Sequence, residues 1–416
     1  MSFSKDRPER SLAAISAGTV ENYDRYKNLF ITPVWGEEFV REFLEISLPS
    51  QLSAGNLGAL HPDDSVYCIV TSARDRQVID ASDVVRSLRE RVSVQFVVHD
   101  DVAAVRVQKT YDLMHEMYNR VLARIRGEIN CFFLSADIFC SDGLFTRAIA
   151  AIDAGKRVVF VPTMRVAKDS FVRAVHETGR HSLSASDTVA LLMEHEQIIT
   201  RAGVVNDAGG AIFSLPSHTV YRMSNGYVGR WNVMHPLVVR VRPNPPMIEA
   251  TVDWNYGVLD VAGSDDVHVF WDSDDGIALT TAPEAYTQGG RVSYSGADKM
   301  RTKNLIRWLG YGWALNIHVL QMDGVVCLHS GPIDHDEYAK GVMAVDRIWK
   351  PFRDVIARLQ KAPRQTAALQ ASGRSSYNEF LNSRAISITS SRWILLKSNP
   401  VGAVKAVLRK LGRMLA

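Results

Sequence analysis

The sequence contains little cysteine and no long apolar run. Its 416 residues include four cysteines, which lie far apart or inside apolar stretches and form no C-x-x-C pair: Cys68, Cys131, Cys140 and Cys327. Disulfide frameworks and zinc sites use closely spaced cysteines, so neither is expected, and a reducing cytoplasm fits best. The first residues, MSFSKDRPER, lack the apolar region of a signal peptide. No stretch reaches the roughly 18 apolar residues of a membrane-spanning helix.

Several catalytic signatures are also missing. The sequence has no G-x-x-x-x-G-K-[ST] loop, no G-x-G-x-x-G after its first strand, no H-E-x-x-H and no G-x-S-x-G. We therefore do not expect P-loop hydrolysis, Rossmann dehydrogenation, zincin proteolysis or α/β-hydrolase chemistry, because each depends on one of these motifs.

Acidic residues are absent from the C-terminal tail. From Phe380 onward the chain carries seven basic residues: Arg384, Arg392, Lys397, Lys405, Arg409, Lys410 and Arg413. In SNPVGAVKAVLRKLGRMLA the helical period places Val and Leu on one face and Lys and Arg on another, which is typical of helices on anionic membrane surfaces. The alternative is that the apolar face of this helix packs on the parent domain. Aromatic residues are not interleaved with the basic ones, so nucleic-acid binding is not expected. We predict peripheral attachment to the inner face of the cytoplasmic membrane.

The order of apolar segments predicts an α/β fold. Between residues 28 and 162 strand patterns alternate with helical ones, which indicates a mostly parallel, Rossmann-type sheet with helices on both faces. Composition then shifts towards Gly, Val, Trp and Tyr with many turn signals. We therefore divide the chain into an N-terminal extension (1–27), an α/β half (28–205), a mixed, β-rich half of the same domain (206–334), a helical segment (335–361), a linker (362–378) and the tail (379–416).

Polar residues follow three successive predicted strands. The first strand leads into Thr32, Pro33 and Trp35, the second into Thr71 and Asp75, and a later one into Asp137. In open α/β sheets ligands bind beyond the carboxyl ends of the strands, so these positions predict a cleft the size of a nucleotide. Trp35 could offer a platform for a flat ring. Nearby, Ser141 or Asp142 could cap the helix over 144–154, because such side chains accept N–H bonds at a helix start, and capping is the favoured role of Asp142.

The second half adds further polar candidates. In VHVFWDSDDGIAL, Asp272 and Asp274 follow an apolar run and could bind Mg²⁺ or Mn²⁺ or act as a base, while Asp275–Gly276 reads as a turn. In NVMHPLVVRVRP, His235 could be a metal ligand or a base. Arg240 and Arg242 alternate along the same strand and could meet a phosphate. His329 is a weaker candidate of the same kind as His235.

Several of these strings occur in an order that resembles a known family. FITPVWGEEFVREFLEISLPSQLSAGNLGAL, YCIVTSARD, FFLSADIFCSDGLFTRAIAAIDAGKRVVFVPTMR, MHPLVVRVRP and FWDSDD together resemble bacterial glycosyltransferase-like proteins related to the GT-A (family 2-like) nucleotide-diphospho-sugar transferases, over about residues 28–280. The most specific strings are W-G-E-x-F…L-P-S-x-L…G-N and D-x-x-x-S-D-G. The resemblance implies a sugar nucleotide bound over a twisted sheet, often with a divalent metal on a D-x-D at a strand end.

The metal motif departs from the family pattern. At the expected strand end this sequence has one acid, Asp137, whereas its literal D-x-D is Asp272 to Asp274. The resemblance therefore implies either Mn²⁺ or Mg²⁺ held by Asp137, with His235 or Asp274 completing the shell, or a reaction without metal.

These residues lead to one hypothesis and two alternatives. The hypothesis is a glycosyltransferase of bacterial surface polysaccharide assembly that moves a sugar from a nucleotide-activated donor to a glycan or lipid-linked acceptor. The donor would contact Thr32, Pro33, Trp35, Thr71, Asp75, Asp137, Arg240 and Arg242, and Asp272 or Asp274 would be the base. A sugar nucleotidyltransferase is an alternative, although its Gly-rich basic first loop is missing. A non-catalytic scaffold of glycan assembly with the same fold is the other.

Overall fold

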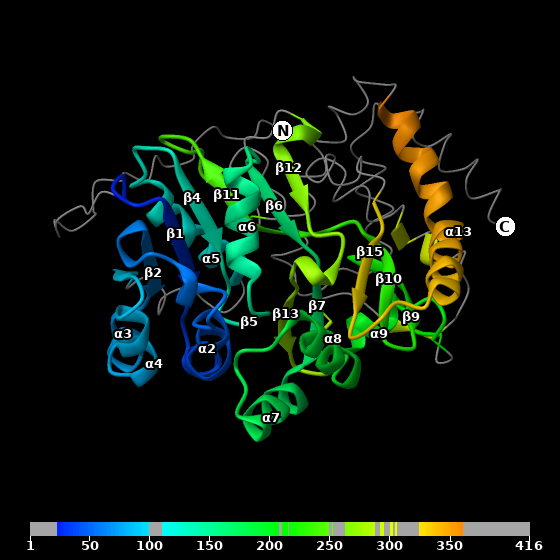
Figure 1. Cartoon of the computed structure of the whole chain (residues 1–416), viewed down its shortest axis with the longest axis horizontal. Helices are drawn as coiled ribbons and strands as arrows, with labels where there is room; N and C mark the ends of the chain where they lie inside the picture. The colour runs from blue at the N-terminus through cyan, green and yellow to red at the C-terminus, as the bar shows by residue number, and fades with distance from the viewer. Residues whose placement is uncertain are drawn as a thin grey trace, which may run out of the picture.

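The computed structural model describes residues 23–99, 110–207, 210–214, 216–248, 252, 263–287, 292–294, 300–302, 304–305 and 324–360. Its main sheet has seven strands in the order β3-β2-β1-β4-β11-β6-β12 (Figure 1). They are β1 (Asn28–Pro33), β2 (Ser65–Thr71), β3 (Ser93–Val98), β4 (Ile129–Phe133), β6 (Val158–Val161), β11 (His235–Val241) and β12 (Val267–Val269). Strand β11 is antiparallel to β4 and β6, and the other six strands run in one direction.

Helices cover both faces of this sheet, as predicted. Strands β1 and β2 are buried at every position, as expected for strands covered on both sides. Alternate β1 residues belong to different cores: Leu29 packs with Leu113 and Met117 of α5 (Thr110–Leu122), and Phe30 packs with Phe145 of α6 (Leu144–Asp153). Helices α3 (Ala73–Asp80) and α4 (Asp83–Arg89) lie on the α6 side.

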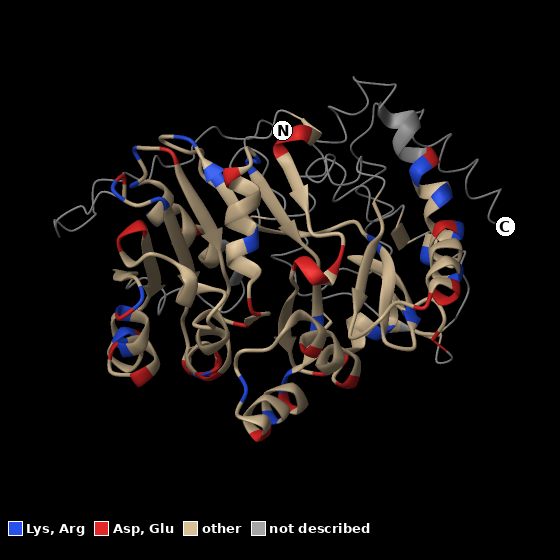
Figure 2. Cartoon of the chain, viewed as in Figure 1, with Lys and Arg blue, Asp and Glu red and all other residues tan. Residues whose placement is uncertain are grey.

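Two smaller sheets lie beside the main one. One consists of β5 (Ile138–Cys140), β13 (Ala278–Ala282) and β7 (Thr163–Ala167), and the other of β15 (Val326–His329), β10 (Gly226–Trp231) and β9 (His218–Met223). A short pair joins β8 (Ile212–Phe213) to β14 (Val292–Ser293). The long helix α13 (His335–Gln360) packs Val345, Ile348 and Trp349 towards β9 and β10 and carries charges of both signs along its length (Figure 2).

The remaining helices are short. They are α1 (Glu37–Glu42), α2 (Leu48–Gln51), α7 (Lys168–Thr178), α8 (Ala185–Glu194), α9 (Ile198–Gly203), the π-helix η2 (Phe43–Ser47) and the 3₁₀ turns η3 (Leu57–Ala59), η4 (Pro62–Asp64), η8 (Ser264–Asp266) and η9 (Ser273–Asp275). Among the described residues, no helix combines the length and the apolar character needed to cross a membrane. Most of the predicted N-terminal extension and the whole linker and tail lie outside the described residues.

The start of α6 differs from the sequence prediction. Gly143, with φ of +83°, is the N-cap residue, and neither Ser141 nor Asp142 caps the helix. The N–H of Phe145 is instead bonded to Asn56 Oδ1 at 2.9 Å, and Asp142 Oδ1 accepts the N–H of Gly55 at 2.6 Å. The capping prediction is therefore wrong, because a loop almost ninety residues earlier supplies the cap and occupies the acid.

Candidate functional site

The parallel strands bring most of the predicted site residues to one edge of the sheet. The carboxyl ends of β1, β2, β4 and β12 meet there, since these strands run in one direction. Strand β11 runs the other way and begins at this edge, where His235 pairs with Val161. Thr71, Asp137, His235 and Asp272 therefore share the edge at which open α/β sheets bind ligands.

Arg240 and Arg242 lie at the opposite edge. Arg240 pairs with Asn130 at the beginning of β4, and its Nε donates to Asn130 Oδ1 at 3.2 Å. Its guanidinium also lies 3.5 Å from Asp153, at the end of α6. Arg242 directly follows β11. The pair was expected to face the donor together with Asp137, and the antiparallel direction of β11 separates it from that edge.

Most of the predicted donor contacts at the ends of β1 and β2 are buried or hydrogen-bonded within the protein. Thr32 and Pro33 are buried, and Thr32 Oγ1 lies 2.7 Å from the hydroxyl of Tyr67. Asp75, in the first turn of α3, accepts the N–H of Gly36 at 2.9 Å and so ties α3 to the segment after β1. Thr71 is fully buried, and its Oγ1 has no hydrogen-bond partner within the described part of the chain.

Trp35 keeps part of its surface open. Its ring centroid lies 6.2 Å from that of Phe39, which is 39% exposed. Trp35 itself is partly exposed, whereas Thr32 and Pro33 are buried. Of these three predicted donor contacts, Trp35 is therefore the one that a ligand can reach.

Asp137 lies beside a charged group that the sequence did not reveal. It is half-buried, and its negative charge reaches Glu42 of α1. Burial and then this charge raise the pKa of Glu42 to about 7, against the effect of Lys168, whose Nζ lies 2.7 Å from Glu42 Oε2. Lys168 Nζ also lies 2.8 Å from Glu38. The sequence did not single out Glu42 or Lys168, because helices far apart in the chain bring them together.

His235 is occupied by the backbone of β4. Its Nε2 lies 2.6 Å from the carbonyl oxygen of Phe133. A carbonyl only accepts, so Nε2 carries a proton and donates it. This nitrogen is therefore not free to bind a metal in this arrangement, and the role of His235 as a metal ligand stays a prediction.

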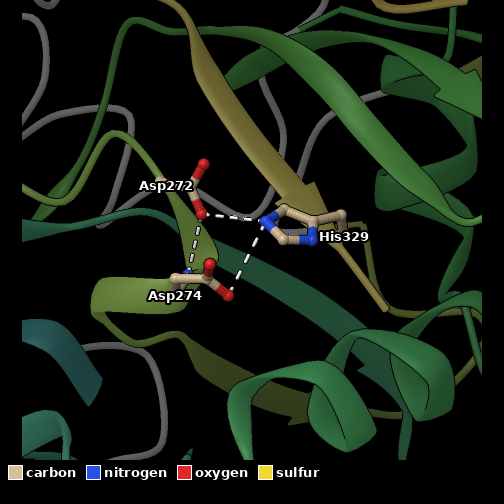
Figure 3. A group of neighbouring side chains, drawn as sticks. All are labelled: Asp272, Asp274 and His329. Carbon is tan, nitrogen blue, oxygen red and sulfur yellow. Dashed lines mark hydrogen bonds and ion pairs between the residues drawn. The ribbon is translucent and has the colours of Figure 1, made fainter. Parts of the chain in front are cut away.

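Within the described residues, one group of three side chains could hold a metal ion: Asp272, Asp274 and His329. One ligand atom from each lies within 4.8 Å of the others. His329 Nε2 is 3.0 Å from Asp272 Oδ1 and 3.7 Å from Asp274 Oδ1, and the three side chains point toward one another (Figure 3). Asp137 and His235 are not members. The sequence did note His329, in LHSGPIDH, but ranked it below His235.

Backbone bonds fix the position of these three residues. Asp272 and Asp274 flank the start of η9, and Asp272 Oδ1 accepts the N–H of Asp274 at 2.8 Å. Ser273 is buried, and its Oγ accepts the N–H of His329 at 3.0 Å. Gly276 ends η9 with φ of +133°, and a Cβ there would lie 2.6 Å from Leu144 Cδ1. The predicted Asp275–Gly276 turn is confirmed.

The hydrogen bonds of His329 suit a metal ligand. Its Nδ1 lies 2.8 Å from the carbonyl oxygen of Gly331, so Nδ1 carries a proton and Nε2 is directed at the two acids. In the neutral ring Nε2 and the carboxylates all present lone pairs, and a second proton or a cation must lie between them. The His329 side chain is 11% exposed, whereas that of Asp274 is 79% exposed, so the group opens to solvent on the acid side.

The donor set is compatible with a divalent cation such as Mn²⁺. Two carboxylates are ligands for Mg²⁺ and Mn²⁺, and the imidazole favours Mn²⁺ over Mg²⁺, which prefers oxygen. Burial, together with the charges of Asp272 and Asp274, raises the pKa of the Cys327 thiol to about 12. In the metal-free protein this thiol therefore stays protonated at neutral pH.

Asp137 and the Asp272–Asp274–His329 group occupy separate points on the edge. Strands β4 and β12 are three steps apart in the sheet, since β11 and β6 lie between them. At about 4.8 Å per step this corresponds to about 14 Å. The sequence hypothesis of one cation shared by Asp137 and Asp274 is not favoured by this spacing.

Comparisons with known proteins add little. Neither a protein-family model nor a curated protein matches the sequence. Among solved structures, the chain is similar to the apo form of mouse xyloside xylosyltransferase 1, with 14% sequence identity and a TM-score of 0.21. The match covers 37% of this chain and 58% of that one.

Proposed function

We propose that this protein transfers a sugar from a nucleotide-activated donor to a glycan or lipid-linked acceptor. The proposal is carried by the position of Asp272, Asp274 and His329, which could hold a cation at the edge of a mostly parallel α/β sheet where ligands usually bind. A nucleotide sugar leaves a diphosphate behind, and a divalent cation at such a site would neutralise its charge. The family resemblance of the sequence motifs supports the same chemistry.

The geometry favours an exchange of the two roles inferred from sequence. Asp272 and Asp274 face the imidazole of His329 and act as cation ligands rather than as the base. Asp137 is a half-buried acid at the same edge, and it would accept a hydrogen bond or a proton from a sugar hydroxyl. Trp35, which is partly exposed just after β1, would contact the nucleoside.

Donor turnover tests this proposal. The protein should cleave or transfer from one member of a panel of UDP-, GDP-, CMP- and dTDP-sugars in the presence of Mn²⁺, and excess EDTA should abolish the reaction. The base preference would identify the nucleotide. Binding of a nucleotide sugar without any turnover would favour the scaffold alternative, and formation of a nucleotide sugar from a sugar phosphate would favour a nucleotidyltransferase.

We also propose attachment to the cytoplasmic membrane through the tail, whose residues lie outside the described part of the chain. Full-length protein should co-sediment with anionic liposomes at low salt, because each basic residue near such a surface adds about 1 kcal/mol. A chain shortened to end near Ser376 should remain in the supernatant. Equal recovery of both proteins in the supernatant would contradict the attachment.

A further inference from the structure

The helix α2 and the residue before it present a buried polar stripe. Ser47, Ser50 and Gln51 are spaced i, i+3 and i+4, which places them on one face, and all three are fully buried. Polar groups in a core are costly unless they are hydrogen-bonded. Apolar side chains at these positions would fill the core without that cost. The hydrogen-bond partners of the three polar side chains therefore indicate what the stripe does.

The inner partners lie on β1 and β2. Gln51 Nε2 donates to Ser47 Oγ at 2.9 Å, and the hydroxyl of Tyr67 donates to Gln51 Oε1 at 2.7 Å. Thr32 Oγ1 lies 2.7 Å from the same hydroxyl, whose proton is already committed, so Thr32 donates to Tyr67. The stripe is therefore fixed to the carboxyl end of β1 through Tyr67.

The outer partners are the two ends of the segment that carries Asp137. Ser47 Oγ donates to the carbonyl of Ser135 at 3.4 Å, and Ser50 Oγ accepts the N–H of Cys140 at 3.1 Å. Asp137 lies between these two contacts. The contacts are made to the backbone, so they set where the segment lies without using the Asp137 carboxylate.

A second row of bonds continues along the next residues. Asn56 Nδ2 donates to the carbonyl of Ser141 at 2.9 Å, and Gly55 N–H donates to Asp142 Oδ1. A Cβ on Gly55 would lie 2.7 Å from Asp142 Oδ1 and from Gly143 N, so only glycine fits there. The L-P-S-x-L…G-N and D-x-x-x-S-D-G strings of the sequence thus meet as one hydrogen-bonded unit.

We infer that residues 47–56, anchored by Tyr67, form a positioning device that fixes Asp137 at the end of β4. Tyr67, Ser47 and Ser50 are positioning residues, because they act on Asp137 through the backbone at Ser135 and Cys140. The effect on catalysis rests on the proposed function. The effect on the 135–141 segment does not.

Hydrogen exchange tests the structural part. In Tyr67→Phe, amides in peptides covering 135–141 should exchange about tenfold faster, the factor for loss of one buried hydrogen bond. Tyr23→Phe is the matched control: Tyr23 is also fully buried, but its hydroxyl lies 3.6 Å from Cys68 Sγ, in the core on the other face of the sheet. It should leave 135–141 unchanged. Unchanged exchange in Tyr67→Phe, or the same rise in both variants, would overturn the inference.

A double-mutant cycle tests the link to Asp137. Tyr67→Phe should lower kcat/KM about tenfold in the wild-type background and have no further effect in an Asp137→Asn background. Additive losses would show that Tyr67 acts elsewhere and would overturn the inference. Absence of turnover in the wild-type protein would reject the proposed function instead, and hydrogen exchange would then decide the inference alone.

Discussion

Replacing His329 by glutamine should weaken Mn²⁺ binding by about 100-fold or more, because even loss of an outer partner of a metal ligand costs 10- to 100-fold. Nε2 of His329 is the nitrogen ligand of the Asp272–Asp274–His329 group, and the bond from Nδ1 to the carbonyl of Gly331 already orients the ring. Asp272→Asn and Asp274→Asn should have effects of similar size. Titration calorimetry, or the loss of the free Mn²⁺ signal in electron paramagnetic resonance, measures the affinity without an activity assay.

Two neighbouring residues provide matched controls. Asp275 belongs to the same run of acids but not to the group, and His335 is an exposed histidine six positions after His329. Asp275→Asn and His335→Gln should bind Mn²⁺ as the wild-type protein does. Binding that survives His329→Gln, or that falls equally in the controls, would mean that exposed acids attract the ion without a formed site.

The second large effect is a pair of opposing pH dependences of the free energy of unfolding. His218 of β9 is 3% exposed, and burial lowers its pKa to about 4. Between that pKa and the ordinary value of 6.5 the unfolded chain binds a proton that the folded chain does not. Stability should therefore rise with pH in this window, by about 3 kcal/mol from pH 4 to 6.5 for this residue.

Glu42 has the opposite effect on the pH dependence of the free energy of unfolding. Its pKa is raised to about 7, chiefly by burial, so between pH 4.5 and 7 the folded chain holds a proton that the unfolded chain has released. Stability should fall with rising pH in this window, by about 3 kcal/mol for this residue. The two contributions overlap and largely cancel in the wild-type protein.

Single variants should reveal each contribution. Urea unfolding between pH 4.5 and 7.5 should show stability rising with pH in Glu42→Gln, which keeps His218 without the opposing acid. It should show stability falling with pH, relative to the wild-type profile, in His218→Gln, which keeps Glu42 without the opposing histidine. His61 is an exposed histidine, so His61→Gln should reproduce the wild-type profile. Parallel profiles in all four proteins would show that neither buried group titrates as described.

The sequence predicted features that depend on local pattern. Apolar runs located the strands, and their alternation with helices predicted a mostly parallel sheet that gathers Thr71 and Asp137 at one edge. The sequence prediction failed where the position of a residue depends on the direction of a strand or on contacts between segments far apart in the chain. The pattern around Arg240 is the same for either direction of β11, yet that direction places Arg240 at the far edge. Glu42, Lys168 and the Asn56 cap of α6 depend on contacts across about ninety residues or more, which no periodicity reveals.

The position of β11 also has consequences for how the chain folds during synthesis. Strands β4 and β6 belong to the first half of the chain, but their partner between them is β11, residues 235–241. The second partner of β6, β12, is made later still. Until these residues leave the ribosome, β4 and β6 present unpaired edges of the kind that promote aggregation. A chain ending near residue 205 would keep β6 without a partner in the main sheet, so the two halves form one cooperative folding unit.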